Sequence, residues 1–137
     1  MMPRVTFVNA NMTARLDLLF QALADRTRLR LLHLLAQGEI CVCYFVEIFD
    51  EPQPKISRHL AYLRRAGIVE TRRDGKWMHY RLAALSDASA ARVLASTLSE
   101  LENDREMQRD LKALRSVCCA TRLPKAIADA PRPAIDV

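Results

Sequence analysis

Residues 53–82 have the sequence QPKISRHLAYLRRAGIVETRRDGKWMHYRL, and their pattern indicates the fold class. Its first half has apolar residues at helical spacing, and Pro54 suits a first helical turn. We expect this helix to end at Gly67, where the hydrophobic period changes from 3.6 to 2. The period of 2 predicts two strands on either side of Asp74-Gly75, a dipeptide typical of hairpin turns. A helix followed by a basic hairpin is therefore expected here.

Apolar residues at helical spacing also occur on both sides of this stretch. They predict a first helix that starts near Thr13, a second that Asp25 caps, and a third that runs to about Phe49. After the hairpin, a leucine stripe over residues 87–119 predicts one long helix. The fold class is therefore mainly α with a small β-hairpin, the outline of a winged helix-turn-helix. We divide the chain into an N-terminal arm (1–12), one folded domain (13–119) and a flexible C-terminal tail (120–137).

The composition fits one globular domain. The chain has 137 residues, of which 50% are hydrophobic and 27% are charged, so it can form a core. It contains no apolar run of about eighteen residues, so we expect no membrane partner. The N-terminus lacks the basic and apolar regions of a secretory signal, which predicts a cytoplasmic location.

Positive charge is concentrated in the expected helix and hairpin. The whole chain carries a net charge of +5, whereas residues 53–82 hold eight basic and two acidic residues, a net charge of +6. A basic patch on such a unit is the pattern expected for binding of double-stranded DNA. The start of the helix and its exposed face supply seven candidate contacts: Gln53, Lys55, Ser57, Arg58, His59, Tyr62 and Arg65.

The donors of these side chains indicate their roles. Arg58 can pair bidentately with guanine, and Gln53 can do the same with adenine. Ser57 and Tyr62 can bind either bases or phosphates. The hairpin tip offers three more cations to the flanking DNA backbone or the minor groove: Arg72, Arg73 and Lys76.

Four cysteines occur as two close pairs, Cys41/Cys43 and Cys118/Cys119. Neither spacing suits a disulfide within the pair, and clustered thiols in a reducing cytosol indicate metal binding or redox chemistry. Thiolates favour thiophilic ions, which include trivalent arsenic and antimony. In a regular helix Cys41 and Cys43 point about 200° apart, so one ion can use both only where the helix is unwound. The chain shows no Ser-His-Asp order and no phosphate loop, so we do not expect an enzyme.

Four segments, in this order, carry a family resemblance: LADRTRLRLL (23–32), GEICVC (38–43), QPKISRHLAYL (53–63) and RDGKW (73–77). They resemble the ArsR–SmtB family of metal-sensing repressors, and the resemblance covers roughly residues 15–119. It implies a homodimer, built from the terminal helices, that binds operator DNA and leaves it on capturing an inducer. No obligatory cofactor is implied, and the inducer is expected to be trivalent arsenic or antimony.

The chain departs from the arsenic-sensing branch of this family at Val46, where that branch has a third cysteine. Two arrangements stay open. One is a composite site of Cys41 and Cys43 with Cys118 or Cys119, within one subunit or across two. The other is a C-terminal dithiol alone, which suits a methylated arsenical.

Two other kinds of sensor stay open as well. One is a thiol-redox or persulfide sensor that uses the same cysteines. The other is a sensor of zinc, cadmium or lead. Zinc takes four ligands, commonly with histidine, but no histidine follows His79. We expect His33, which follows the core-facing Leu32, to be partly buried. His59 and His79, in the expected helix and hairpin, are expected to contact phosphate or neighbouring residues.

Overall fold

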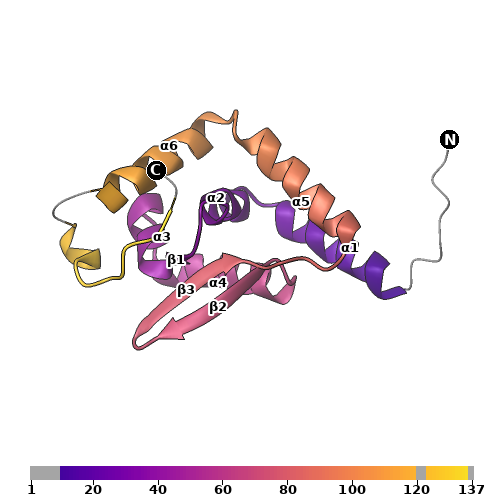
Figure 1. Ribbon diagram of the computed structural model, residues 1–137, viewed down its shortest axis with the longest axis horizontal. Helices are drawn as coiled ribbons and strands as arrows, with labels where there is room; N and C mark the ends of the chain where they lie inside the picture. Colours follow the sequence, from indigo (N-terminus) through magenta and orange to yellow (C-terminus); the bar gives the residue numbers. More distant parts are fainter. Residues whose placement is uncertain (1–9, 120–122, 136–137) are drawn as a thin grey trace.

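The computed structural model describes residues 10–119 and 123–135, in which six α-helices combine with a small antiparallel sheet (Figure 1). The mainly α, winged helix-turn-helix class is confirmed. The elements in chain order are α1 (Ala10–Leu23), α2 (Arg26–Leu35), β1 (Ile40–Cys41), α3 (Val42–Phe49), α4 (Gln53–Arg65), β2 (Val69–Asp74), β3 (Trp77–Leu82), α5 (Ala88–Leu101), α6 (Arg105–Cys119) and the 3₁₀ helix η1 (Lys125–Ile127).

The helices α3 and α4 form the helix-turn-helix. The chain turns sharply at Asp50, whose φ of 51° lies in the left-handed region. α4 then buries Ile56, Leu60 and Leu63 completely, as their spacing predicted. Because these three side chains occupy one face, the opposite face of α4 stays available for a ligand.

The sheet has three strands rather than the two that the sequence predicts. β2 and β3 pair with Asp74 opposite Trp77, and Gly75 adopts a φ of 60° in the turn between them. The additional strand β1 pairs with β3 and places Cys41 opposite His79. A strand of two residues is too short to show a hydrophobic period, so no sequence pattern indicated it.

The long helix predicted over residues 87–119 is wrong, because the chain breaks after Leu101. The Asp104 carboxylate accepts hydrogen bonds from two backbone N–H groups of α6, at 2.9 and 3.2 Å, and so caps that helix. α6 turns back and packs on α2 and α3 (Figure 1). Leu114 of the predicted stripe is therefore buried within the monomer.

Both ends of the fold differ from the prediction. α1 starts at Ala10, three residues before the expected start at Thr13. The C-terminal tail was predicted to be flexible, but residues 123–135 pack against the domain, with Ile127 and Ala130 only 1% and 5% exposed. Apolar side chains in a segment without periodicity were sufficient to hold it on the core.

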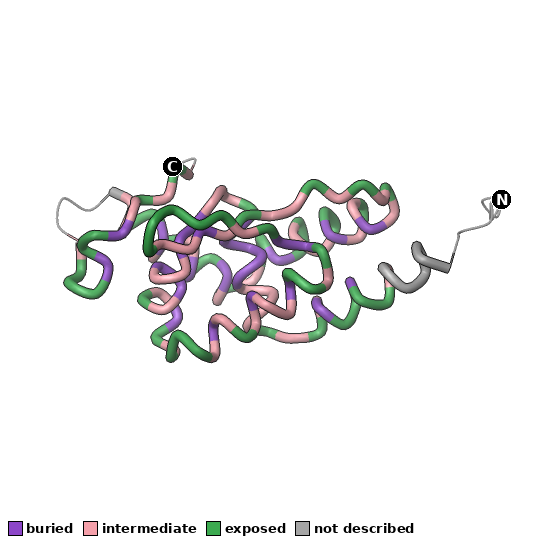
Figure 2. The backbone as a smooth tube through the Cα atoms, turned by 90° about the horizontal axis from the view of Figure 1, so that it is seen from below, coloured by how far each residue is buried: buried purple, intermediate pink, exposed green. Residues whose placement is uncertain are grey.

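The core forms where α2, α3 and α4 meet. Leu31, Leu32, Tyr44 and Phe45 are fully buried there, and Figure 2 shows the buried segments gathered in the middle of the molecule. His33 lies among them at 4% exposure, more deeply than the sequence suggested. Within residues 10–119 and 123–135, no helix has the length and apolar character to cross a membrane.

Candidate DNA interface and thiol site

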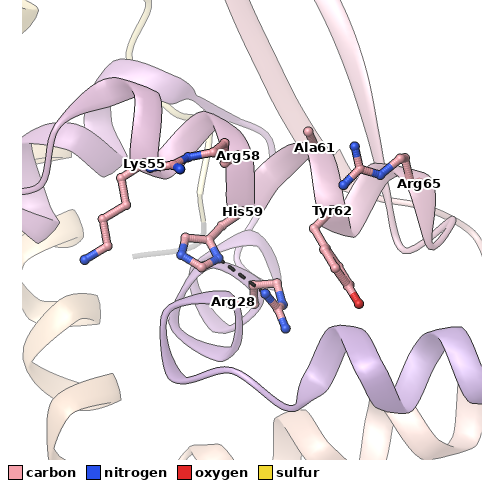
Figure 3. A pocket seen from close by; sticks show the side chains of 7 residues that line it. All are labelled: Arg28, Lys55, Arg58, His59, Ala61, Tyr62 and Arg65. Atoms are coloured by element: carbon pink, nitrogen blue, oxygen red, sulfur yellow. Dashed lines mark hydrogen bonds between the residues drawn. The ribbon is translucent and has the colours of Figure 1, made fainter.

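The exposed face of α4 borders an open hollow of about 590 Å³ (Figure 3). Ser57 is half-buried on the same helix, and Gln53 is exposed at its start. The hollow is lined by five of the predicted contacts and two further residues: Lys55, Arg58, His59, Tyr62, Arg65, Ala61 and Arg28. The fold thus gathers cations and hydrogen-bond donors on one face, as binding of a phosphate backbone requires.

Arg28 reaches this hollow from α2, and the sequence analysis did not identify it. Its guanidinium donates hydrogen bonds to the carbonyl oxygens of Gln21 and Ala22 at 3.1 and 2.8 Å. It lies 4.2 Å from the centre of the Tyr62 ring, and its Nη1 is 3.5 Å from Nδ1 of His59 (Figure 3). Arg28 therefore positions two side chains of α4. The available signal was an arginine three residues after the helix cap, inside a segment that carries the family resemblance.

His59 is a partly buried histidine beside these cations. Its Nδ1 lies 3.7 Å from Oδ1 of Asp25, the residue that caps α2. Burial lowers the pKa of His59, and the neighbouring Arg28 lowers it further, while Asp25 opposes them. The ring is therefore neutral at pH 7. In the tautomer that carries its proton on Nε2, Nδ1 accepts from Arg28 and Nε2 can donate to a phosphate.

The three cations predicted on the hairpin differ in the contacts that they make. Arg73 and Lys76 are exposed near the tip, and Lys76 lies 4.8 Å from the centre of the Trp77 ring. Arg72 instead pairs with Glu39, with Nε 3.1 Å from Oε1. Arg72 is therefore less available to DNA than the other two.

The structure brings Cys41 and Cys43 together, with their Sγ atoms 3.1 Å apart. Cys41 has an extended backbone, with φ −72° and ψ 142°, and immediately precedes α3, whereas Cys43 lies in the first helical turn. This is the unwound arrangement that a shared ion requires. The hydrogen bond from the Cys43 thiol lowers the pKa of Cys41 to about 7, and the same contact raises the pKa of Cys43.

The other two cysteines, Cys118 and Cys119, are the last two residues of α6. Cys118 is half-buried near the end of α6 and packs against the core, and Val46 holds the position where the family branch has its third cysteine. The Cys119 side chain lies outside the described residues. Within the described part of the chain, no three His, Cys, Asp or Glu side chains are arranged to hold a metal ion.

Burial is the main cause that raises the pKa of Tyr44 to about 12, with smaller contributions from the nearby Cys43, Cys118 and Cys41, while Arg132 opposes the shift. The Tyr44 hydroxyl therefore lies within electrostatic range of both thiol-bearing segments.

The sequence of the helix-turn-helix region is shared with known regulatory proteins. Residues 25–71 match the family described as bacterial regulatory protein, arsR family. The chain belongs to the ArsR family. Over 77 residues it is 51% identical to the arsenical resistance operon repressor of Escherichia coli K12, a match that covers 56% of this chain and 66% of that protein. The Escherichia coli repressor and two arsenic resistance regulators of Pseudomonas putida match this chain over 66%, 52% and 56% of their own lengths. The chain therefore spans between about half and two thirds of the length of these relatives.

Solved structures extend the ArsR-family comparison beyond the helix-turn-helix. The antimony-specific transcriptional repressor AntR aligns with a TM-score of 0.58 at 29% identity, covering 74% of this chain and 89% of AntR. The homodimeric winged helix-turn-helix domain of Mb0332 from Mycobacterium bovis aligns with a TM-score of 0.59 at 29% identity, covering 76% of this chain and 94% of that domain.

Proposed function

We propose that this ArsR-family protein is a homodimeric transcriptional repressor that acts in the cytoplasm. It binds operator DNA and leaves it when trivalent arsenic or antimony binds its cysteine thiolates. The observation that carries this proposal is the close approach of Cys41 and Cys43 at the first helix of the helix-turn-helix. The similarity to the arsenical resistance operon repressor and to AntR supports the same inducer chemistry.

The DNA contacts follow from exposure and charge. Arg58 is exposed on α4 and is proposed to read a base, while Gln53 is exposed at the helix start and is proposed to pair with adenine. Ser57 and Tyr62 bind bases or phosphates. The other contacts are to the phosphate backbone, with Arg72 contributing least because of Glu39: Lys55, His59, Arg65, Arg72, Arg73 and Lys76.

Two connections link the thiols to this DNA-binding surface. α3 packs against α4, so a change in the first turn of α3 reaches the helix that reads DNA. Cys41 also pairs with His79 on β3, so the same change reaches the hairpin. An ion that binds both sulfurs fixes the backbone between them and biases these elements away from the DNA-binding arrangement.

The third sulfur is proposed to come from Cys118 or Cys119, because trivalent arsenic takes three thiolates. The position of Tyr44 supports this composite site, since its hydroxyl lies within range of both thiol-bearing segments. The competing proposal is a C-terminal dithiol that binds a methylated arsenical without Cys41 and Cys43.

The dimer interface is proposed to involve α1 and α5. Leu18 and Phe20 are 43% and 53% exposed on α1, unusually high for large apolar side chains. Leu18 also lines a hollow of about 390 Å³, together with Leu85 and Ala90. The apolar face of α6 is already packed on α2 and α3, so it contributes less.

A DNA-release titration tests the proposed function. The protein is bound to its promoter DNA and titrated with arsenite, antimonite, methylarsenite, zinc and cadmium at fixed salt. We expect release by the trivalent metalloids at concentrations far below those of zinc or cadmium. Release by zinc or cadmium alone would support the zinc, cadmium or lead sensor instead.

A thiol-redox or persulfide sensor is the second candidate. It is favoured by the 3.1 Å approach of the two sulfurs and by the pKa of about 7 for Cys41, since thiolates are the reactive form. Release by hydrogen peroxide or polysulfide, with no response to arsenite, identifies this function.

A further inference from the structure

The C-terminal segment of residues 123–135 crosses the domain beside the thiol-bearing helices. In Figure 1 it runs from η1 past α3 toward α6. Ile127 and Ala130 are 1% and 5% exposed and belong to the same apolar cluster as Tyr44. The segment is therefore anchored through apolar contacts rather than only lying on the surface.

Two hydrogen bonds attach this segment to the elements that carry the cysteines. The Tyr44 hydroxyl, one residue after Cys43 in α3, donates to the carbonyl oxygen of Ala130 at 3.5 Å. Arg132 Nη1 donates to the carbonyl oxygen of Cys118, near the end of α6, at 3.2 Å. The segment therefore contacts both α3 and α6 within one residue of a thiol.

The end of the segment passes close to Gly38, three residues before Cys41. A Cβ atom at Gly38 would lie 2.7 Å from the carbonyl oxygen of Ala134, which is too close for any other residue without movement. Gly38 also has a φ of 152°, a conformation that side chains rarely permit. This close approach places the segment against the chain that leads into β1.

We propose that residues 123–135 form a strap that holds the C-terminal end of α6 against α3, so that the two cysteine pairs stay close enough to share one ion. The proposal rests on the proposed function, since it assigns the strap a positioning role at that thiol site. The strap makes none of the proposed DNA contacts, and its role is to lower the inducer concentration needed for release.

Strap variants of the full chain test this positioning role. Ile127→Ala/Arg132→Ala removes an apolar anchor and the bond to Cys118, and Lys125→Ala is the matched control because it removes one exposed positive charge from the same segment. Arg132→Ala alone is included because it alters an exposed residue and leaves the core intact. Alkylation of Cys43 and Cys118 by N-ethylmaleimide, followed by mass spectrometry, and arsenite-induced DNA release are measured for each.

We expect alkylation in the double variant to be about ten-fold faster than in the control, because local opening exposes the thiols. The arsenite midpoint should rise by about ten-fold through loss of effective concentration of the third sulfur, with affinity for DNA unchanged in the absence of arsenite. Alkylation rates and midpoints equal to those of Lys125→Ala in both strap variants would overturn the strap. A wild-type complex that ignores arsenite while the variants still alkylate faster would overturn the proposed function and leave the strap standing.

Discussion

Arg30 and Asp110 form a two-pronged ion pair, with nitrogen–oxygen distances of 2.8 and 2.9 Å, although they lie 80 residues apart in the sequence. Asp110 is only 5% exposed, and the Arg30 guanidinium also lies 4.0 Å from the centre of the Phe49 ring. The pair joins α6 to α2, and the exposed bonds of Arg26 to Asp104 and Glu106 reinforce the same contact. It fixes the helix that carries the C-terminal cysteines.

Arg30→Met should destabilise the protein by about 3 kcal/mol, because removing one partner leaves a buried carboxylate uncompensated. Urea unfolding at a fixed protein concentration measures this change. Arg26→Met is the control, since that arginine is exposed and its loss should matter little. The double variant Arg30→Met/Asp110→Leu should recover most of the stability. An Arg30→Met midpoint equal to that of the wild type contradicts a stabilising role for the pair.

Arg58→Ala should weaken binding to the operator by about 1–3 kcal/mol and reduce the preference for operator over scrambled DNA, since a base-reading side chain is lost. Binding isotherms with both DNAs at one salt concentration measure the two effects. Arg64→Ala is the matched control, because Arg64 is exposed on the same helix but does not line the hollow. Equal losses on operator and scrambled DNA would instead make Arg58 a phosphate contact.

Lys76→Ala or Arg73→Ala should weaken binding to all DNA sequences and reduce the slope of log affinity against log salt by about 1, because a phosphate contact is lost. Arg72→Ala should have a smaller effect, since Glu39 already pairs with that arginine. Titrations at several salt concentrations give the slopes. A larger change for Arg72 than for Lys76 is the result that contradicts this ranking.

The Cys41 thiol should ionise with a midpoint near pH 7, because the Cys43 thiol donates a hydrogen bond to it. Below that pH the thiol is protonated, so the reaction with arsenite should slow as the pH falls through 7. Cys43→Ala removes the donor, and the midpoint should then rise toward the ordinary value of 9.0. Ultraviolet absorbance of the thiolate, with Cys41→Ser as the blank, measures both midpoints. Identical midpoints in wild type and Cys43→Ala disprove the role of this hydrogen bond.

Single serine substitutions distinguish the two site models. Under the composite site, Cys41→Ser or Cys43→Ser abolishes release by arsenite without affecting DNA binding, because the ion loses a ligand. Under the C-terminal dithiol site, both variants still respond to methylarsenite, whereas Cys118→Ser and Cys119→Ser do not. DNA-release titrations with both arsenicals measure this. If all four variants still leave DNA on arsenite, the inducer binds elsewhere.

Local patterns predicted the helix-turn-helix and the hairpin correctly because their signals lie within a few residues of one another. The apolar spacing of Ile56, Leu60 and Leu63 determines which face of α4 is buried, and this in turn leaves Arg58 exposed. Asp74-Gly75 indicated the hairpin, although the turn formed one residue later. The concentration of positive charge identified the same surface that the structure presents (Figure 3).

Sequence patterns alone were sufficient to predict the fold class, the helix proposed to face DNA and the two thiol pairs. Three further features became visible only in the folded chain: Arg28 reaches α4, α6 folds back through Arg30 and Asp110, and residues 123–135 pack on the domain. These contacts join residues far apart in the chain, and no local period records them. The 3.1 Å approach of Cys41 and Cys43 also needed the structure, because it depends on a short strand that forms only by pairing with β3.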